Sequence, residues 1–276
     1  MSTSQLEPVM RRVAANGIEL SVAEYGTSGP PLLLLHGIGS RYVSWLPVIE
    51  RLLPHFRLIA PDFRGHGDSA KPASGYLHVN YAADLDGLIK ELGLERPLIV
   101  GHSLGAIVAY AWAGLHGIKT ARIVLEDPPT RTGPDDSSML DGWLALASMS
   151  LNEAEAYYRD QHPEWSAEDC YRRAVSITST SPAVFRELRD QSRRAGGIDR
   201  LSSLPPVAVP ILIIYGELAH GGMSAPEDIH RIEGQSPNAR AVMIPGGNHS
   251  LHRDHTDAFL AAALPFLLDA APKFPS

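Results

Sequence analysis

Short apolar runs recur along the chain, each followed within two residues by Gly, Pro or Asp, and they restrict the folds it can adopt. The runs are Leu32–Leu35, Leu58–Ala60, Pro97–Val100, Arg122–Glu126, Ile211–Tyr215 and Ala241–Ile244. Continuous apolar segments of this length are typical of strands buried on both faces of a parallel sheet. Helical patterns lie between them, at Tyr81–Leu92 and Leu104–Leu115, and another follows the last of them, at Thr256–Leu268. The alternation predicts an α/β fold, a mostly parallel sheet with helices on both faces.

Two parts of the chain depart from this alternation. Asn16-Gly17 joins Val9–Ala14 to Glu19–Tyr25, which predicts an antiparallel hairpin. Residues 130–205 contain no buried-strand pattern. They contain four helical stretches instead, at Ser138–Met149, Glu153–Gln161, Ala167–Thr178 and Pro182–Arg194. We therefore expect a core formed by residues 1–129 and 206–276, with residues 130–205 inserted as a helical cap (lid) at the carboxyl ends of the strands, where such sheets bind ligands.

Charge and cysteine content narrow the partners that the chain is expected to have. It has 24 Lys and Arg against 31 Asp and Glu, a net charge of −7, and no basic run. We therefore expect it to bind neither nucleic acid nor an anionic membrane. The N-terminus lacks the apolar segment of a secretory signal, and the single cysteine, Cys170, excludes an internal disulfide. These features predict a cytoplasmic protein with a small-molecule substrate, and none predicts a particular oligomeric state.

Gly101-His102-Ser103-Leu104-Gly105 is the strongest chemical signal in the sequence. It follows an apolar strand and opens a helix, which is the setting of a nucleophile elbow. Glycine is needed on both sides because a serine on so sharp a turn leaves no space for neighbouring side chains. The helix N-terminus behind the serine favours a developing negative charge. We expect Ser103 to be a nucleophile rather than part of an ordinary glycine turn.

His36-Gly37-Ile38-Gly39 directly follows the first buried strand and predicts a loop that stabilises an oxyanion. The backbone N–H groups of Ile38 and Leu104 are the expected donors to the substrate oxygen. Gly37 and His102 border the same place and are candidate substrate contacts, as is His36.

Gly246-Gly247-Asn248-His249 follows the last apolar run and supplies the candidate base, since a serine hydroxyl needs one and imidazole titrates near neutral pH. His252 and His255 continue a series that suggests a metal site. No carboxylate motif accompanies the series, so we expect no metal and no other cofactor. We interpret His252 and His255 as solvated residues at the start of a surface helix.

These segments resemble those of the α/β-hydrolase superfamily over nearly the whole chain. The resemblance rests on His36-Gly37, Asp62-Phe63-Arg64-Gly65-His66-Gly67-Asp68-Ser69, Gly101–Gly105 and Gly247-Asn248-His249. It implies a nucleophile at Ser103, a base at His249 and an oxyanion hole formed by the Ile38 and Leu104 amides. The segment from Asp62 to Ser69 is usually a structural signature in that superfamily.

The acid of the triad does not stand where relatives commonly carry it. They place it in a Gly-x-x-Asp pattern after the strand before the last, but Gly216-Glu217-Leu218-Ala219 has alanine there. Asp127, after the strand Arg122–Glu126, resembles the acid of haloalkane dehalogenases and fungal zearalenone lactonases. We expect Asp127 to contact His249, held extended by the proline that follows it.

Two other carboxylates remain alternatives for the acid. Glu217 follows a strand end, although two residues before the position that relatives use. Glu126 neighbours Asp127, but alternation along the strand should direct it to the opposite side. We rank Glu217 before Glu126.

A serine nucleophile argues against dehalogenase and epoxide-hydrolase chemistry and favours acyl transfer. Met139, Trp143 and Met149 of the predicted cap are expected to line a pocket for a medium-sized, largely apolar substrate. We therefore expect a serine hydrolase, an esterase or lactonase that works through an acyl-enzyme. A carbon–carbon bond hydrolase or a thioesterase is an alternative, and a hydrolase-derived ligand-binding protein is another, because alanine replaces the usual acid.

Overall fold

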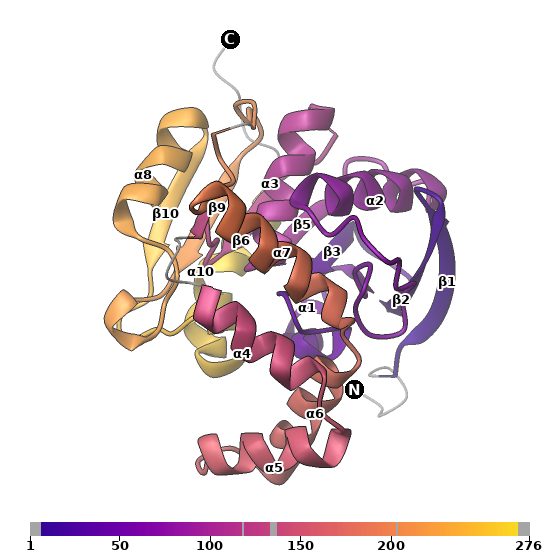
Figure 1. The fold of residues 1–276 in the computed structure, drawn as a ribbon. Helices are drawn as coiled ribbons and strands as arrows, with labels where there is room; N and C mark the ends of the chain where they lie inside the picture. Colours follow the sequence, from indigo (N-terminus) through magenta and orange to yellow (C-terminus); the bar gives the residue numbers. More distant parts are fainter. Residues whose placement is uncertain (1–6, 118, 133–136, 203, 270–276) are drawn as a thin grey trace.

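The computed structural model describes residues 7–117, 119–132, 137–202 and 204–269 (Figure 1). Its centre is an eight-stranded sheet in the order β1-β2-β4-β3-β5-β6-β9-β10. The strands are β1 (Val9–Ala15), β2 (Ile18–Tyr25), β3 (Pro31–Leu35), β4 (Arg57–Pro61), β5 (Leu98–His102), β6 (Ile123–Glu126), β9 (Ile211–Tyr215) and β10 (Ala239–Met243). The pairs β1–β2 and β2–β4 are antiparallel, and the remaining neighbours are parallel. The predicted mostly parallel sheet and its N-terminal hairpin are confirmed.

Helices cover both faces of the sheet, and this explains the continuous apolar runs. Leu33 and Leu35 of β3 pack in the cluster that includes α2 (His78–Glu91), α3 (Leu104–His116) and α8 (Pro226–Gln235). Leu32 and Leu34 face the opposite side, which α1 (Leu46–Leu52) and α10 (Thr256–Leu268) cover. Since successive residues alternate between two buried faces, the central strands are apolar except at their carboxyl ends, where His102 ends β5 and Glu126 ends β6.

Four helices lie between β6 and β9 and form a layer with its own small core. They are α4 (Ser137–Ala147), α5 (Leu151–Gln161), α6 (Ala167–Thr178) and α7 (Pro182–Ala195), called the helical layer below. The helices α5, α6 and α7 each begin after a serine whose hydroxyl accepts a backbone N–H of the first turn. A short pair of strands, β7 (Arg131–Thr132) and β8 (Ile198–Asp199), joins the two ends of the layer. In Figure 1, α4 and α7 cross in front of the sheet and α5 lies farthest from it.

Some elements were not predicted or differ from the prediction. The helices α1 and α8 were not predicted, because two to three turns are too short for a helical repeat to stand out in the sequence. The last helix covers the predicted range, Thr256–Leu268, and continues through Pro265, a residue that usually kinks or ends a helix. No helix in the described ranges has the length and apolar character needed to cross a bilayer.

Candidate active site

Ser103 lies on the sharp turn between β5 and α3, with φ of 53° and ψ of −113°. A Cβ at Gly101 would lie 2.4 Å from the Gly105 carbonyl oxygen, and a Cβ at Gly105 would lie 2.1 Å from that of Leu35. No side chain fits at either position: Gly101 lets β5 approach the start of α3, and Gly105 lets α3 approach β3. The backbone geometry expected of a nucleophile elbow is present, and Ser103 is 4% exposed.

Two buried histidines hold the loop that carries Ile38. The Nδ1–H of His36 donates to the Gly37 carbonyl (2.7 Å), while its Nε2 accepts the Phe63 N–H (2.9 Å). The Nε2 of His66 accepts the Gly39 N–H (3.1 Å). Both rings must be neutral to accept these bonds, and burial favours that form. It lowers the pKa of His36 well below its ordinary value and that of His66 to about 4.

The expected oxyanion donors are unoccupied by other groups. Within the described ranges, neither the Ile38 N–H nor the Leu104 N–H donates to another protein group. Both residues line cavities that Ser103 also lines. His36 does not have its expected role as a substrate contact, because both of its ring nitrogens are hydrogen-bonded to backbone groups.

Asp127 and His249 form the carboxylate–imidazole contact predicted from the sequence. The Nδ1 of His249 lies 2.5 Å from Asp127 Oδ2, and the Asp127 side chain is fully buried. Backbone N–H groups of Met223 (2.8 Å) and Ser224 (3.2 Å) also donate to this carboxylate. Because His249 uses Nδ1 here, its Nε2 is left to serve a hydroxyl. The expectation of an extended Asp127 was wrong: its φ is 42°, which turns the side chain off the strand toward His249.

Glu217 faces another way. Its carboxylate accepts the Gly246 N–H (3.0 Å) and lies 3.1 Å from the Nδ1 of His220. The bond from Gly246 lowers the pKa of Glu217 below its ordinary value. Glu217 therefore holds the turn that precedes His249 and makes no contact with the imidazole itself.

A second carboxylate–histidine pair lies beside the first. Glu126 accepts both the backbone N–H and the Nδ1–H of His252, each at 2.9 Å. The interpretation of His252 as solvated was wrong, since this residue is 2% exposed and Glu126 is fully buried. Burial acts to raise the pKa of Glu126, but its interactions with His252 act against burial, and the pKa lies below its ordinary value. Glu126 is therefore an ionised carboxylate in the protein interior.

His102 connects the elbow to the turn that carries the base. Its Nε2–H donates to the backbone carbonyl of His249 (2.8 Å). Burial lowers the pKa of His102 well below its ordinary value despite the nearby carboxylate of Glu126, so the ring is neutral. The turn at 249–252 is thus fixed to β6 through Asp127 and Glu126, and to β5 through His102.

The ligand atoms of His102, Glu126 and His252 lie within 4.8 Å of one another. Both Glu126 oxygens accept from His252, and the His102 Nε2–H is given to a carbonyl. Two of the ring nitrogens and both carboxylate oxygens are therefore already hydrogen-bonded, whereas His252 Nε2 is buried without a hydrogen-bond partner in the described structure.

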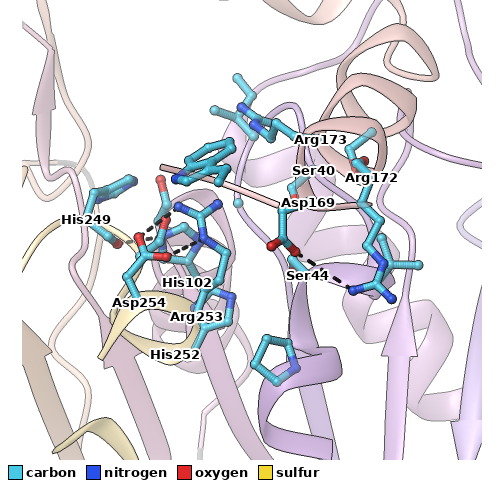
Figure 2. A pocket seen from close by; sticks show the side chains of 18 of the residues that line it. Ser40, Ser44, His102, Asp169, Arg172, Arg173, His249, His252, Arg253 and Asp254 are labelled. Atoms are coloured by element: carbon cyan, nitrogen blue, oxygen red, sulfur yellow. Dashed lines mark hydrogen bonds and ion pairs between the residues drawn. The ribbon is translucent and has the colours of Figure 1, made fainter. Parts of the chain in front are cut away.

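Ser103 and His249 line a cavity of about 400 Å³ between the sheet and the helical layer. Figure 2 shows His249 and Arg253 on one side of this cavity and Asp169 and Arg172 on the other. The expected substrate contacts Gly37, His102 and Trp143 line the same cavity.

A second cavity, of about 40 Å³, lies on another side of Ser103 and has a mainly apolar lining. Met139, Trp143 and Met223 contribute to it. Met149 instead packs against the core of the helical layer and lines neither cavity.

The larger cavity is more polar than the sequence predicted, because it is lined by Arg172, Arg173 and Arg253. Two of these arginines stand on α6, where Asp169, Arg172, Arg173 and Ser176 follow one another at helical spacing and all face the cavity. That spacing was a signal in the sequence. It was missed because polar residues on one helix face are normally a solvated face.

The chain is similar to enzymes of known name over most of its length. The model of the alpha/beta hydrolase family matches residues 32–263. The 2-(acetamidomethylene)succinate hydrolase of Mesorhizobium japonicum is 29% identical over 267 residues, 94% of this chain and 95% of that protein. The N-formylmaleamate deformylase of Pseudomonas putida is 31% identical over 265 residues, 92% of this chain and 95% of that protein. The crystal structure of N-formylmaleamic acid deformylase from Pseudomonas putida S16 superposes with a TM-score of 0.76, at 25% identity, over 92% of this chain and 100% of the other.

Proposed function

Since the chain belongs to the alpha/beta hydrolase family, we propose that it is a serine hydrolase that cleaves a small acyl compound through an acyl-enzyme. The observation that carries the proposal is the Asp127–His249 contact of 2.5 Å at the cavity that Ser103 lines. A buried carboxylate on Nδ1 fixes the tautomer that leaves Nε2 to accept a proton, which is the arrangement that a serine nucleophile requires.

The proposed reaction has two halves. Ser103 Oγ attacks the acyl carbon while its proton passes to His249 Nε2, and the Asp127 carboxylate stabilises the resulting imidazolium. The substrate oxygen takes the negative charge and accepts the N–H groups of Ile38 and Leu104. His249 then protonates the leaving group, which departs and leaves the acyl-enzyme. Water attacks that ester with His249 as base, releasing the acid and restoring Ser103.

The scissile bond is an ester or a lactone in the leading form of this proposal. An N-acyl bond is a second candidate, because the substrates in the names of both full-length relatives carry an N-acyl group, acetamido in one and N-formyl in the other. A purely ligand-binding role is less well supported. It was considered because alanine stands at 219, yet Asp127 supplies the carboxylate that this position lacks.

Ser103→Ala tests the proposal. We expect this variant to lose about 10⁶ in kcat toward p-nitrophenyl acetate and to lose labelling by a fluorophosphonate, with an unchanged unfolding midpoint. Ser148→Ala, an exposed serine directly after α4, is the matched control and should behave as the wild type. Turnover by Ser103→Ala above a few per cent of wild type, or fluorophosphonate label on another residue, would refute the assignment. Parallel rates on ethyl acetate and N-acetyl or N-formyl amides decide between the two bond types.

A further inference from the structure

The arginines of the larger cavity differ in how far neighbouring carboxylates neutralise them. Arg172 pairs with Glu168 and lies 4.0 Å from Asp169. Arg253 contacts both oxygens of Asp254, at 2.7 and 2.8 Å. These two guanidinium groups already have anionic partners, so neither requires one from a ligand.

Arg173 stands apart from them. Within the described ranges no carboxylate lies at ion-pair distance from its guanidinium, although the side chain is half-buried. It donates from Nη1 to the Gly39 carbonyl and lies over the ring of Tyr158 at 5.5 Å. This hydrogen bond uses one N–H of the guanidinium group. The remaining N–H groups are available to a planar anion that binds in a bidentate way, such as a carboxylate.

Arg173 lies close to the proposed oxyanion donor and lines the same cavity as the nucleophile. Gly39, which accepts from Arg173, follows Ile38 directly, and Ile38 carries the proposed oxyanion donor. Arg173, Ile38 and Ser103 line one cavity. A ligand whose carbonyl oxygen binds at Ile38 therefore reaches Arg173 with a short chain.

The charge of the cavity is opposite to that of the chain. Two of the three arginines in its lining, Arg172 and Arg253, are paired with carboxylates, so Arg173 supplies its excess positive charge, whereas the whole chain has a net charge of −7. An excess of positive charge inside a concave, partly desolvated site raises the local concentration of anions. The positive charge of the cavity is thus a local property that the average charge of the chain does not explain.

We propose that Arg173 forms a carboxylate subsite, and that the preferred substrates are short acyl compounds bearing a carboxylate near the scissile bond. This inference rests on the proposed serine-hydrolase function and names its substrate class. It replaces the largely apolar substrate expected from the sequence, leaving an apolar group for the smaller cavity beside Met139.

Monomethyl and dimethyl succinate test the subsite, because they share the scissile ester and differ in one carboxylate. With hydrolysis followed by proton release, we expect wild-type kcat/KM to be at least about 10-fold higher for the monoester. Arg173→Gln removes the charge but keeps a donor for Gly39. It should lower kcat/KM for the monoester by roughly 10- to 100-fold and leave the diester within about threefold. Arg172→Gln removes an equal charge from the same helix and should keep most of the selectivity.

Binding of succinate provides a readout that needs no turnover. Succinate should inhibit p-nitrophenyl acetate hydrolysis competitively and raise the Tm of Ser103→Ala, and Arg173→Gln should lose the inhibition. Arg173→Lys keeps the positive charge but loses the bidentate guanidinium, and it should retain part of the selectivity. It keeps the test decisive if Arg173→Gln fails to fold.

Two results would overturn the subsite. One is an equal wild-type rate on both esters without inhibition by succinate. The other is an equal loss on both esters in Arg173→Gln, which would assign Arg173 to holding the Gly39 loop. Failure of the serine-hydrolase proposal looks different, since Ser103→Ala would then hydrolyse the neutral diester like the wild type.

Discussion

Replacing His252 by leucine tests whether the buried Glu126–His252 pair fixes the turn that carries His249. The change removes the imidazole that both Glu126 oxygens accept from, while the backbone N–H of residue 252 still donates. It leaves an ionised carboxylate that is fully buried and has lost its imidazole partner. Such a loss costs about 3–5 kcal/mol in other proteins. For a chain of this size, that corresponds to a fall in Tm of roughly 10 °C.

The pH dependence of the loss identifies its cause. Without His252, burial should raise the folded-state pKa of Glu126 above its unfolded value, so the folded carboxyl loses stability as the pH rises through that range. The difference in unfolding free energy between wild type and His252→Leu should therefore be largest near pH 8 and shrink toward pH 5. Glu126→Gln, which has no charge to bury, should cost only about 1–3 kcal/mol. The double variant should cost less than the two single changes added together.

Activity should fall together with stability, because the same turn holds His249 against Asp127. A displacement of about 1 Å at a reacting group is enough for a loss of about 10²-fold in rate. We expect His252→Leu to lower kcat toward p-nitrophenyl acetate by that factor with little change in KM. Burst titration with a fluorophosphonate separates slow enzyme from unfolded enzyme.

His255→Leu is the matched control, three residues along the same segment and only half-buried. It should keep wild-type stability and kcat. The reasoning would be refuted if His252→Leu stayed within about 1 kcal/mol and threefold in kcat of the wild type.

Three further predictions concern other parts of the site. Asp127→Asn should lower kcat about 10⁴-fold and leave the fold intact, whereas Glu217→Gln should cost far less; the reverse order in kinetics at neutral pH would make Glu217 the acid. Trp143→Ala, which opens both cavities, should change the ranking of acyl chain lengths more than the Tm, and an unchanged ranking would assign Trp143 to packing. Because burial lowers the folded pKa of His66 to about 4, the stability tied to its neutral form should be lost as pH falls from about 6.5 to 4, by roughly 3 kcal/mol; a flat urea midpoint across that window would contradict it.

The sheet and the elbow could be predicted because their physical causes are local in the sequence. A strand buried on both faces is apolar along most of its length, which β3 and β9 show. A serine between Gly101 and Gly105 can project from the turn only because those two positions have no Cβ. The placement of Asp127 near His249 followed from its position at a strand end.

The predictions were wrong where contacts between residues far apart in the sequence determine the structure. His252 lies in a polar segment, and only the fold brings it to Glu126, 126 positions earlier in the chain. Pro128 restricts the backbone of Asp127, yet the contacts with His249 and the 223–224 amides hold φ at 42°. Arg173 stands on a helix whose polar face is normally solvated, and only the helix packing encloses it in a cavity.

Because Asp127 stands at the end of the neighbouring strand, the loop at 216–225, after β9, does not have to supply the carboxylate that contacts His249. It serves that carboxylate through main-chain atoms alone, the N–H groups of Met223 and Ser224. A substitution that keeps the backbone path is therefore neutral for the acid, and proline at 223 or 224 is the change that would remove a donor. The exposed residues 218–220 can vary in length and chemistry without altering the charge next to His249. Met223, which lines the smaller cavity beside Ser103, is the position in this loop where selectivity can be changed separately from the reaction chemistry.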